Sequence, residues 1–116
     1  MKKKGRRNMA QIELKIYKEN SKTDVEKTYT ADGYELMLGT VEDFMNIIDI
    51  EKLGDNIEAA KMMLKCYKQL MPLLKDIFPD ITDEEIKRVK VNELVGTFMQ
   101  VGKAIIDGFD VLKKGN

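Results

Sequence analysis

This chain of 116 residues has no histidine and no tryptophan, and its single cysteine is Cys66. Without histidine it lacks the most common general base and metal ligand of proteins, and its only serine, Ser21, has no histidine to activate it. One cysteine excludes an internal disulfide and, together with the missing histidine, an ordinary zinc site. Neither a GxGxxG motif nor a P-loop is present. No spacing indicates carboxylate or lysine chemistry, so we expect a protein that is not an enzyme and holds no metal or cofactor.

Long apolar runs are missing too. No run approaches the ~18 residues of a membrane-spanning helix, and residues 1–30 lack the apolar region of a signal peptide. We therefore expect a cytoplasmic protein, which agrees with the single cysteine. A composition of 43% hydrophobic and 34% charged residues is typical of a globular domain, and the length fits one domain.

The net charge is zero, but positive charge is concentrated at the start of the chain. The sequence MKKKGRR holds five of the basic residues, so the remainder has a net charge of −5. Residues 1–8 are predicted to form a disordered basic extension, because like charges repel and nothing apolar holds the segment down. This segment is either a tail for nucleic acid or an anionic surface, or an upstream extension before a natural start at Met9, and the second interpretation is favoured. Residues 9–116 are predicted to form a single helical domain with an N-terminal hairpin.

Two segments near the N-terminus alternate apolar and polar residues. Residues 10–18 are predicted to form a half-buried strand. Its inward side chains are Ile12, Leu14 and Ile16, and its outward side chains are Glu13, Lys15 and Tyr17. Residues 25–30 alternate again, and the turn-rich segment 19–24 between the two predicts an antiparallel β-hairpin that packs on helices. The apolar run at 34–38 is left unassigned, with a third strand as one interpretation.

Residues 55–81 carry the widest apolar face and are predicted to form the central helix. One line of apolar residues has alternating steps of three and four: Ile57, Ala60, Leu64, Tyr67, Met71, Leu74 and Phe78. A second line runs beside it: Ala59, Met63, Cys66, Leu70 and Leu73. Asp55 is the expected N-cap, and Pro72 is expected to kink the helix or to break it into two pieces.

Capping signals predict two of the other helices. Thr40 is the expected N-cap of a helix that ends near Gly54. Thr82 and Glu85 form a T-x-x-E capping box, which predicts the start of a short helix over residues 83–90.

The last helix is predicted over residues 93–113, with Asn92 as its N-cap. Gly102 lies on its apolar stripe and indicates either a close approach by another helix or a tolerated glycine. The predicted fold class is α+β, mainly α: an N-terminal antiparallel β-hairpin followed by a small helical bundle of three to four helices.

Two groups of side chains raise the question of binding. Helix capping and solvation explain an acidic cluster better than a cation site does, because its spacing fits no EF-hand loop: Asp76, Asp80, Asp83, Glu84 and Glu85. Several methionines lie among the apolar positions, where methionine either fills gaps in a core or adapts to irregular partners. The helices carry more apolar surface than they and the hairpin need, which favours self-association or a client helix held in a groove.

Two stretches of the chain together resemble a known family. They are KTYTADGYELMLGTVEDFMNIIDIEKLGD, residues 27–55, and DIFPDITDEEIKRVKVNELVGTF, residues 76–98. Both are similar to the small tail assembly chaperones of long-tailed phages and of prophages of Gram-positive bacteria. The resemblance covers roughly residues 9–112, and it rests on packing and capping patterns rather than on catalytic signatures. The basic start of the chain departs from the family pattern.

The resemblance implies a non-enzymatic helper that binds the tape-measure protein in the host cytoplasm, helps to recruit tail-tube subunits of the major tail protein, and is absent from the mature virion. Family members often have a second, longer product made by frameshifting, and the lysines at 113 and 114 are compatible with a slippery site. We expect a helical client on the central and last helices, with these residues as its contacts: Met71, Leu74, Phe98 and Phe109. The alternative hypothesis is a small nucleic-acid-binding or regulatory protein that uses the basic tail.

Overall fold

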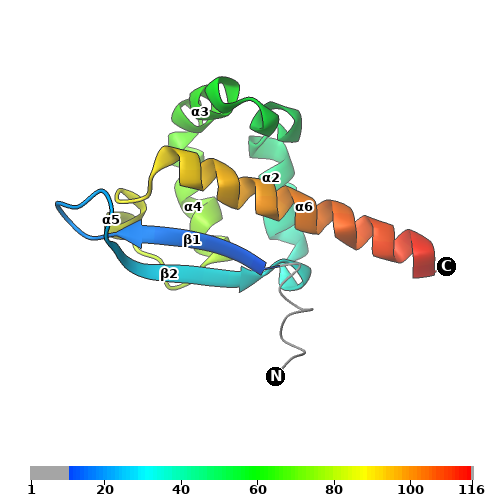
Figure 1. The fold of residues 1–116 in the computed structure, drawn as a ribbon. Helices are drawn as coiled ribbons and strands as arrows, with labels where there is room; N and C mark the ends of the chain where they lie inside the picture. The colour runs from blue at the N-terminus through cyan, green and yellow to red at the C-terminus, as the bar shows by residue number, and fades with distance from the viewer. Residues whose placement is uncertain (1–10, 116) are drawn as a thin grey trace.

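The structure, a computed structural model, describes residues 11–115, and side chains as far as residue 107. The predicted basic extension over 1–8 and the start at Met9 lie outside the described residues. As predicted, the fold is α+β and mainly α: a two-stranded antiparallel sheet comes first, and helices follow (Figure 1). No helix in the described part of the chain combines the length and the apolar character needed to cross a membrane.

The predicted hairpin is confirmed. Strand β1 (Gln11–Tyr17) pairs with β2 (Val25–Asp32), with Leu14 opposite Tyr29. The inward side chains of β1 are buried as expected, but Tyr17 was expected to point outward and is only 7% exposed. The pairing shifts by one residue between Ile16 and Tyr17, and such an irregularity turns the following side chain to the other face.

The long helix α6 (Val91–Gly115) packs on β1 and also covers the edge of β1 that β2 leaves free. The Thr97 hydroxyl donates to the carbonyl of Glu13 at 2.6 Å, and the Glu13 N–H donates to Oε1 of Gln100 at 2.8 Å. These bonds satisfy backbone groups that a two-stranded sheet would otherwise expose. Because α6 begins at Val91, the predicted N-cap Asn92 is wrong and lies inside the helix.

The predicted central helix is two helices, α3 (Asn56–Lys65) and α4 (Tyr67–Ile77). The chain breaks at Cys66, whose φ of −100° and ψ of 14° are not helical, whereas α4 continues through Pro72. The break was therefore predicted six residues too late. It allows the two halves to meet different neighbours, since α3 packs on α6 and α4 packs on α2. The predicted cap is confirmed: the Asp55 carboxylate accepts hydrogen bonds from two backbone N–H groups of the first turn of α3.

The segment between the sheet and α3 also differs from expectation. Helix α2 (Leu38–Ile47) starts two residues before Thr40, which was the predicted cap but lies buried inside the helix. The chain then leaves the α-helix and forms a 3-10 helix, η3 (Ile50–Gly54), capped by the carboxylate of Asp49. The residues considered for a third strand form a 3-10 turn, η2 (Gly33–Glu35), and the start of α2.

Helix α5 (Asp83–Ile86) is shorter than predicted, but its capping box is present. The Thr82 hydroxyl accepts from the Glu85 N–H, and the Glu85 carboxylate accepts from the Thr82 N–H. In Figure 1, α5 lies beside the loop end of the hairpin, and α6 crosses the sheet and extends past the other elements. The largest fully buried side chains include one aromatic each from α2, the α4–α5 connection and α6: Phe44, Phe78 and Phe98.

Candidate functional site

Two of the four residues predicted to contact a client are buried in the structure. Leu74 and Phe98 are completely buried, and the Phe98 ring packs against Phe44 with centroids 5.8 Å apart. Both side chains belong to the core, so the structure does not expose them to a client as the sequence analysis expected. Met71 is half-buried against the core, and Phe109 lies in α6 at a position whose side chain is outside the described ones.

Other apolar side chains do reach the surface of the helices. On α3, Ile57 is 68% exposed and Leu64 is 71% exposed, and on α6, Met99 and Ile106 are each 49% exposed. The two members of each pair are seven residues apart, so they lie on one side of their helix. Side chains of this size are usually buried, and exposed groups of them indicate a surface for another molecule.

A hollow lies next to the exposed side chains of α6. It has a volume of about 430 Å³ and lies between η3 and α6, with Ile50 and Leu53 on one side and Met99 and Ile106 on the other. We call this hollow the η3–α6 groove. Leu53 is buried and Ile50 is half-buried, so the groove has apolar walls that are part of the folded core.

Gly102 forms part of the same groove. A Cβ atom added at this position would lie 3.8 Å from the side chain of Ile50. Gly102 therefore faces a neighbouring element, which was one of the two interpretations of its place on the apolar stripe. The neighbour is the 3-10 helix η3 and not an α-helix. The distance is an ordinary van der Waals contact, so alanine is also sterically compatible with this position.

Charged side chains border the groove. Lys103 and Asp107 on α6 form an ion pair of 3.3 Å, and Glu51 lies on the η3 side. An apolar centre with a polar border is the usual composition of a protein–protein contact. Met99 and Ile106 were not among the predicted contacts, because they lie beside the main apolar stripe of the last helix and not on it. Their spacing of seven residues was the available signal.

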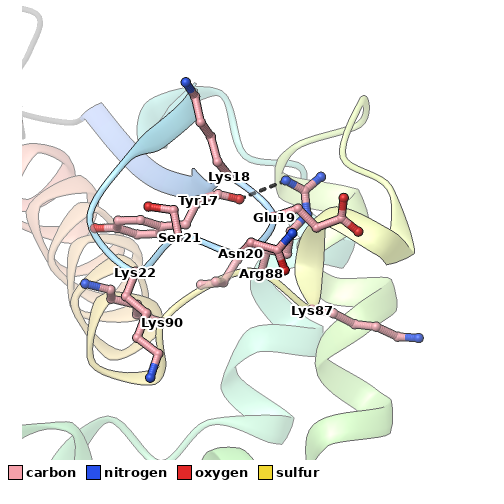
Figure 2. Close-up of a pocket in the computed structure, with 10 residues that line it drawn as sticks. Tyr17, Lys18, Glu19, Asn20, Ser21, Lys22, Lys87, Arg88 and Lys90 are labelled. Atoms are coloured by element: carbon pink, nitrogen blue, oxygen red, sulfur yellow. Dashed lines mark hydrogen bonds between the residues drawn. The ribbon is translucent and has the colours of Figure 1, made fainter.

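A second hollow, of about 580 Å³, lies at the C-terminal end of β1, between the hairpin loop and the α5–α6 connection (Figure 2). The buried ring of Tyr17 forms part of its wall, and lysines surround it. The Tyr17 hydroxyl donates a 2.5 Å hydrogen bond to Glu93, which holds the ring in place and raises the pKa of the phenol. We call this hollow the basic pocket.

The acidic cluster has structural partners. Asp83 pairs with Lys75 at 2.5 Å, and Glu85 lies 3.0 Å from Lys27 and accepts from the Tyr29 hydroxyl at 2.6 Å. The hydrogen bond from Tyr29 is the largest cause that lowers the pKa of Glu85, and with the contact to Lys27 it brings this pKa to about 2. Within residues 11–115, no group of three or more acidic or cysteine side chains is arranged to hold a metal ion.

The described residues thus place two kinds of binding chemistry at the surface, apolar side chains at the η3–α6 groove and lysines at the basic pocket. Exposed apolar side chains and concentrated charge are both chemistries by which proteins contact other polypeptides. Comparisons with protein families, with curated proteins and with solved structures find no match for this chain.

Proposed function

We propose that this protein is a non-enzymatic tail assembly chaperone of a phage or prophage, which binds the tape-measure protein and helps to recruit subunits of the major tail protein. It acts in the host cytoplasm and leaves the tail before the virion is mature. The resemblance of residues 27–55 and 76–98 to that family suggests the role. The observation that carries the proposal is the η3–α6 groove, where apolar side chains are exposed beside an apolar hollow.

The groove suits a helical client. Met99 and Ile106 are seven residues apart, which is ~10 Å along a helix axis, and a client helix repeats its own apolar anchors at the same interval. Methionine adds flexibility, so one groove can fit successive segments of a long client whose sequences differ. The polar border keeps the free protein soluble while the groove is empty.

The energetics call for several contacts. Full burial of a large apolar side chain contributes about 1.5–3 kcal/mol, and Met99 and Ile106 are each half-exposed already. Together they supply about 2 kcal/mol, which is less than a micromolar complex needs. The client must therefore also contact the walls of the groove, including Ile50 of η3. A long client with many weak sites would be bound by many copies of a small chaperone.

The test is co-expression with a tape-measure protein, which the proposal expects to be encoded beside this gene, followed by pull-down. The variant M99E/I106E places two carboxylates in the groove and is expected to abolish recovery of the client. The matched control I57E/L64E adds the same charge on α3, at two exposed apolar residues with the same spacing, and is expected to retain the client. Circular dichroism of both variants checks that they fold.

Three results would count against the proposal. Failure of the wild-type protein to retain the tape-measure protein contradicts the chaperone function. Loss of the client in I57E/L64E but not in M99E/I106E moves the binding surface to α3. A DNA affinity that falls steeply with salt and disappears on deletion of residues 1–8 favours the nucleic-acid alternative instead. Light scattering of the free protein shows whether a second copy occupies the groove.

A further inference from the structure

The basic pocket concentrates positive charge on a body that is otherwise acidic. Its walls come from the hairpin loop, residues 18–22, and from the α5–α6 connection, residues 87–90. One acidic side chain, Glu19, and five basic ones line it. The basic residues are Lys18, Lys22, Lys87, Arg88 and Lys90. The chain beyond its first seven residues has a net charge of −5, so the pocket is a positively charged region on a negatively charged body.

The lysines of the pocket differ from Arg88 in their pairing. The Arg88 guanidinium lies 2.6 Å from Glu26 and donates to the Tyr17 carbonyl at 2.8 Å. Within residues 11–107, none of the four lysines forms an ion pair, and Lys90 instead lies over the Tyr17 ring at 4.5 Å. Ammonium groups that have no carboxylate partner in the folded chain remain available to pair with a bound anion.

The wall between the lysines is apolar and held in place. Tyr17 is 7% exposed, and it is bonded at its hydroxyl to Glu93 and at its carbonyl to Arg88. The bond to Glu93 raises the pKa of the Tyr17 phenol above its ordinary value. Val89 is half-buried beside it. A ligand with only charged groups would leave this wall without a contact.

The hairpin loop is organised before any ligand arrives. The Lys18 N–H donates to the Asp24 carbonyl at 2.9 Å, and the Ser21 hydroxyl accepts from the Asp24 N–H at 2.9 Å. Asn20 has a φ of 67°, a left-handed conformation that asparagine adopts more readily than most residues. A preformed loop lowers the entropy cost of binding.

We propose that the basic pocket binds an acidic polypeptide segment of a partner protein. The lysines face carboxylates of the segment, and the wall formed by Tyr17 and Val89 contacts an apolar side chain between them. Figure 2 shows the ammonium groups of Lys18, Lys22 and Lys87 spread around the mouth of the pocket. They do not meet at one point, so a row of carboxylates fits them better than a single phosphate does.

A duplex nucleic acid fits this surface less well. Its phosphates extend far beyond a pocket of this size, with one negative charge per ~1.7 Å of axis. Carboxylates also lie at this surface: Glu26 and Glu84 contact Arg88, and Glu19 lines the pocket. A long polyanion would meet these groups and the net negative body around them.

The inference does not depend on the chaperone function, and a synthetic peptide tests it. The probe is a fluorescein-labelled decapeptide of aspartate and glutamate with one central phenylalanine, and binding is measured by fluorescence anisotropy with the full chain. We expect binding that weakens as salt is added. A decapeptide with asparagine and glutamine in place of the acidic residues is expected not to bind.

Matched variants locate the site. K18Q/K22Q/K87Q/K90Q is expected to weaken binding at least about tenfold. The control K52Q/K61Q/K65Q/K68Q removes the same charge from exposed lysines of η3, α3 and α4 and is expected to bind like the wild type. Both keep the basic start of the chain, so any peptide bound there contributes equally. Arginine at the four pocket positions is expected to restore binding.

Two results overturn the inference. Equal peptide affinity of the two glutamine variants shows that the pocket is not the site. Tighter binding of a DNA duplex than of the acidic peptide, lost in K18Q/K22Q/K87Q/K90Q, shows a nucleic-acid surface instead. Circular dichroism of each variant confirms the fold, and the arginine variant gives a second reading if a glutamine variant does not fold.

Discussion

The hydroxyl of Tyr29 on β2 donates a 2.6 Å hydrogen bond to Oε1 of Glu85 in α5. The same oxygen accepts from the Thr82 N–H at 3.1 Å, and the second oxygen lies 3.0 Å from the ammonium group of Lys27. Glu85 is 7% exposed, so one buried carboxylate joins the sheet to the capping box of α5. Each of these bonds favours the charged form, which is why the pKa of Glu85 is lowered to about 2.

Acid is therefore expected to destabilise the fold through Glu85. The folded protein holds this carboxylate charged more strongly than the unfolded chain does. Its contribution is fully present above the ordinary pKa of 4.5 and is lost as the pH falls to about 2. Urea unfolding is expected to show that the free energy of unfolding of the wild type falls as the pH is lowered across this range. The difference in free energy of unfolding between the wild type and Glu85→Gln is expected to shrink at the same time. Glu42→Gln, at an exposed position of α2, is the control and should follow the wild type. A wild-type advantage over Glu85→Gln that persists undiminished to about pH 2 would contradict the assignment.

Tyr29→Phe removes the hydroxyl and keeps the ring, which lies 6.1 Å from Phe78 between centroids. A hydrogen bond to a charged group contributes about 1.5–3 kcal/mol, so the free energy of unfolding is expected to fall by about that amount. Urea denaturation measures it, and a double-mutant cycle with Glu85→Gln should show coupling between the two sites. Tyr34→Phe is the control, since Tyr34 is 56% exposed and should change stability by less than ~0.5 kcal/mol. Additive effects of Tyr29→Phe and Glu85→Gln would show that the bond contributes nothing.

Local signals were sufficient for several elements of the fold. The alternation in residues 10–18 and 25–30 predicted the hairpin, and the caps at Asp55 and Thr82 are made by the expected side chains. The break at Cys66 had no such signal, because neither glycine nor proline marks it. It follows from packing, since α3 and α4 turn toward different partners. Pro72, the residue with the strongest local signal for a break, lies inside a continuous helix.

The candidate binding surface was harder to predict from the sequence, for the same reason. Periodicity identifies which residues share a stripe, but tertiary packing decides which part of the stripe is covered. The line that contains both Ile57 and Leu74 was predicted as one face, yet Ile57 is 68% exposed and Leu74 is fully buried. The chain turns at Cys66 between them. On α6, Phe98 is buried and the adjacent Met99 is half-exposed, a difference that depends on where the helix meets β1 and η3.

The burial of Phe98 gives a direct test of its role. Phe98→Ala is expected to lower the free energy of unfolding by about 3–5 kcal/mol, the usual cost of deleting a buried aromatic side chain. Ile106→Ala, at a half-exposed residue of the same helix, should cost only about 1 kcal/mol. Urea denaturation of both variants measures the difference. If Phe98 only supports the core, Phe98→Ala should lose client binding only to the extent that it unfolds. A folded Phe98→Ala variant that fails to bind the client would indicate that Phe98 contacts the client.

In contrast to Phe98, substitution of Pro72 is expected to stabilise the folded protein. Proline has no N–H to donate to the carbonyl of Lys68 one turn earlier, and its ring crowds that carbonyl, yet α4 extends from Tyr67 to Ile77 around it. Alanine restores the donor and improves helix propensity by up to ~3 kcal/mol. The gain is reduced by about 1 kcal/mol or less, because proline also restricts the unfolded chain. Pro72→Ala is therefore expected to raise the free energy of unfolding by about 1–2 kcal/mol in urea denaturation.

The control for this change is Gln69→Ala, at an exposed position in the same helix, which should change stability by less than ~0.5 kcal/mol. Leu73 and Leu74, the two residues after the proline, are 1% and 0% exposed. If Pro72→Ala destabilises the protein, the backbone around Pro72 must have a shape that these side chains need in order to reach the core. The proline would then be a packing requirement of α4, and the cost of its missing hydrogen bond would be smaller than the cost of moving two leucines.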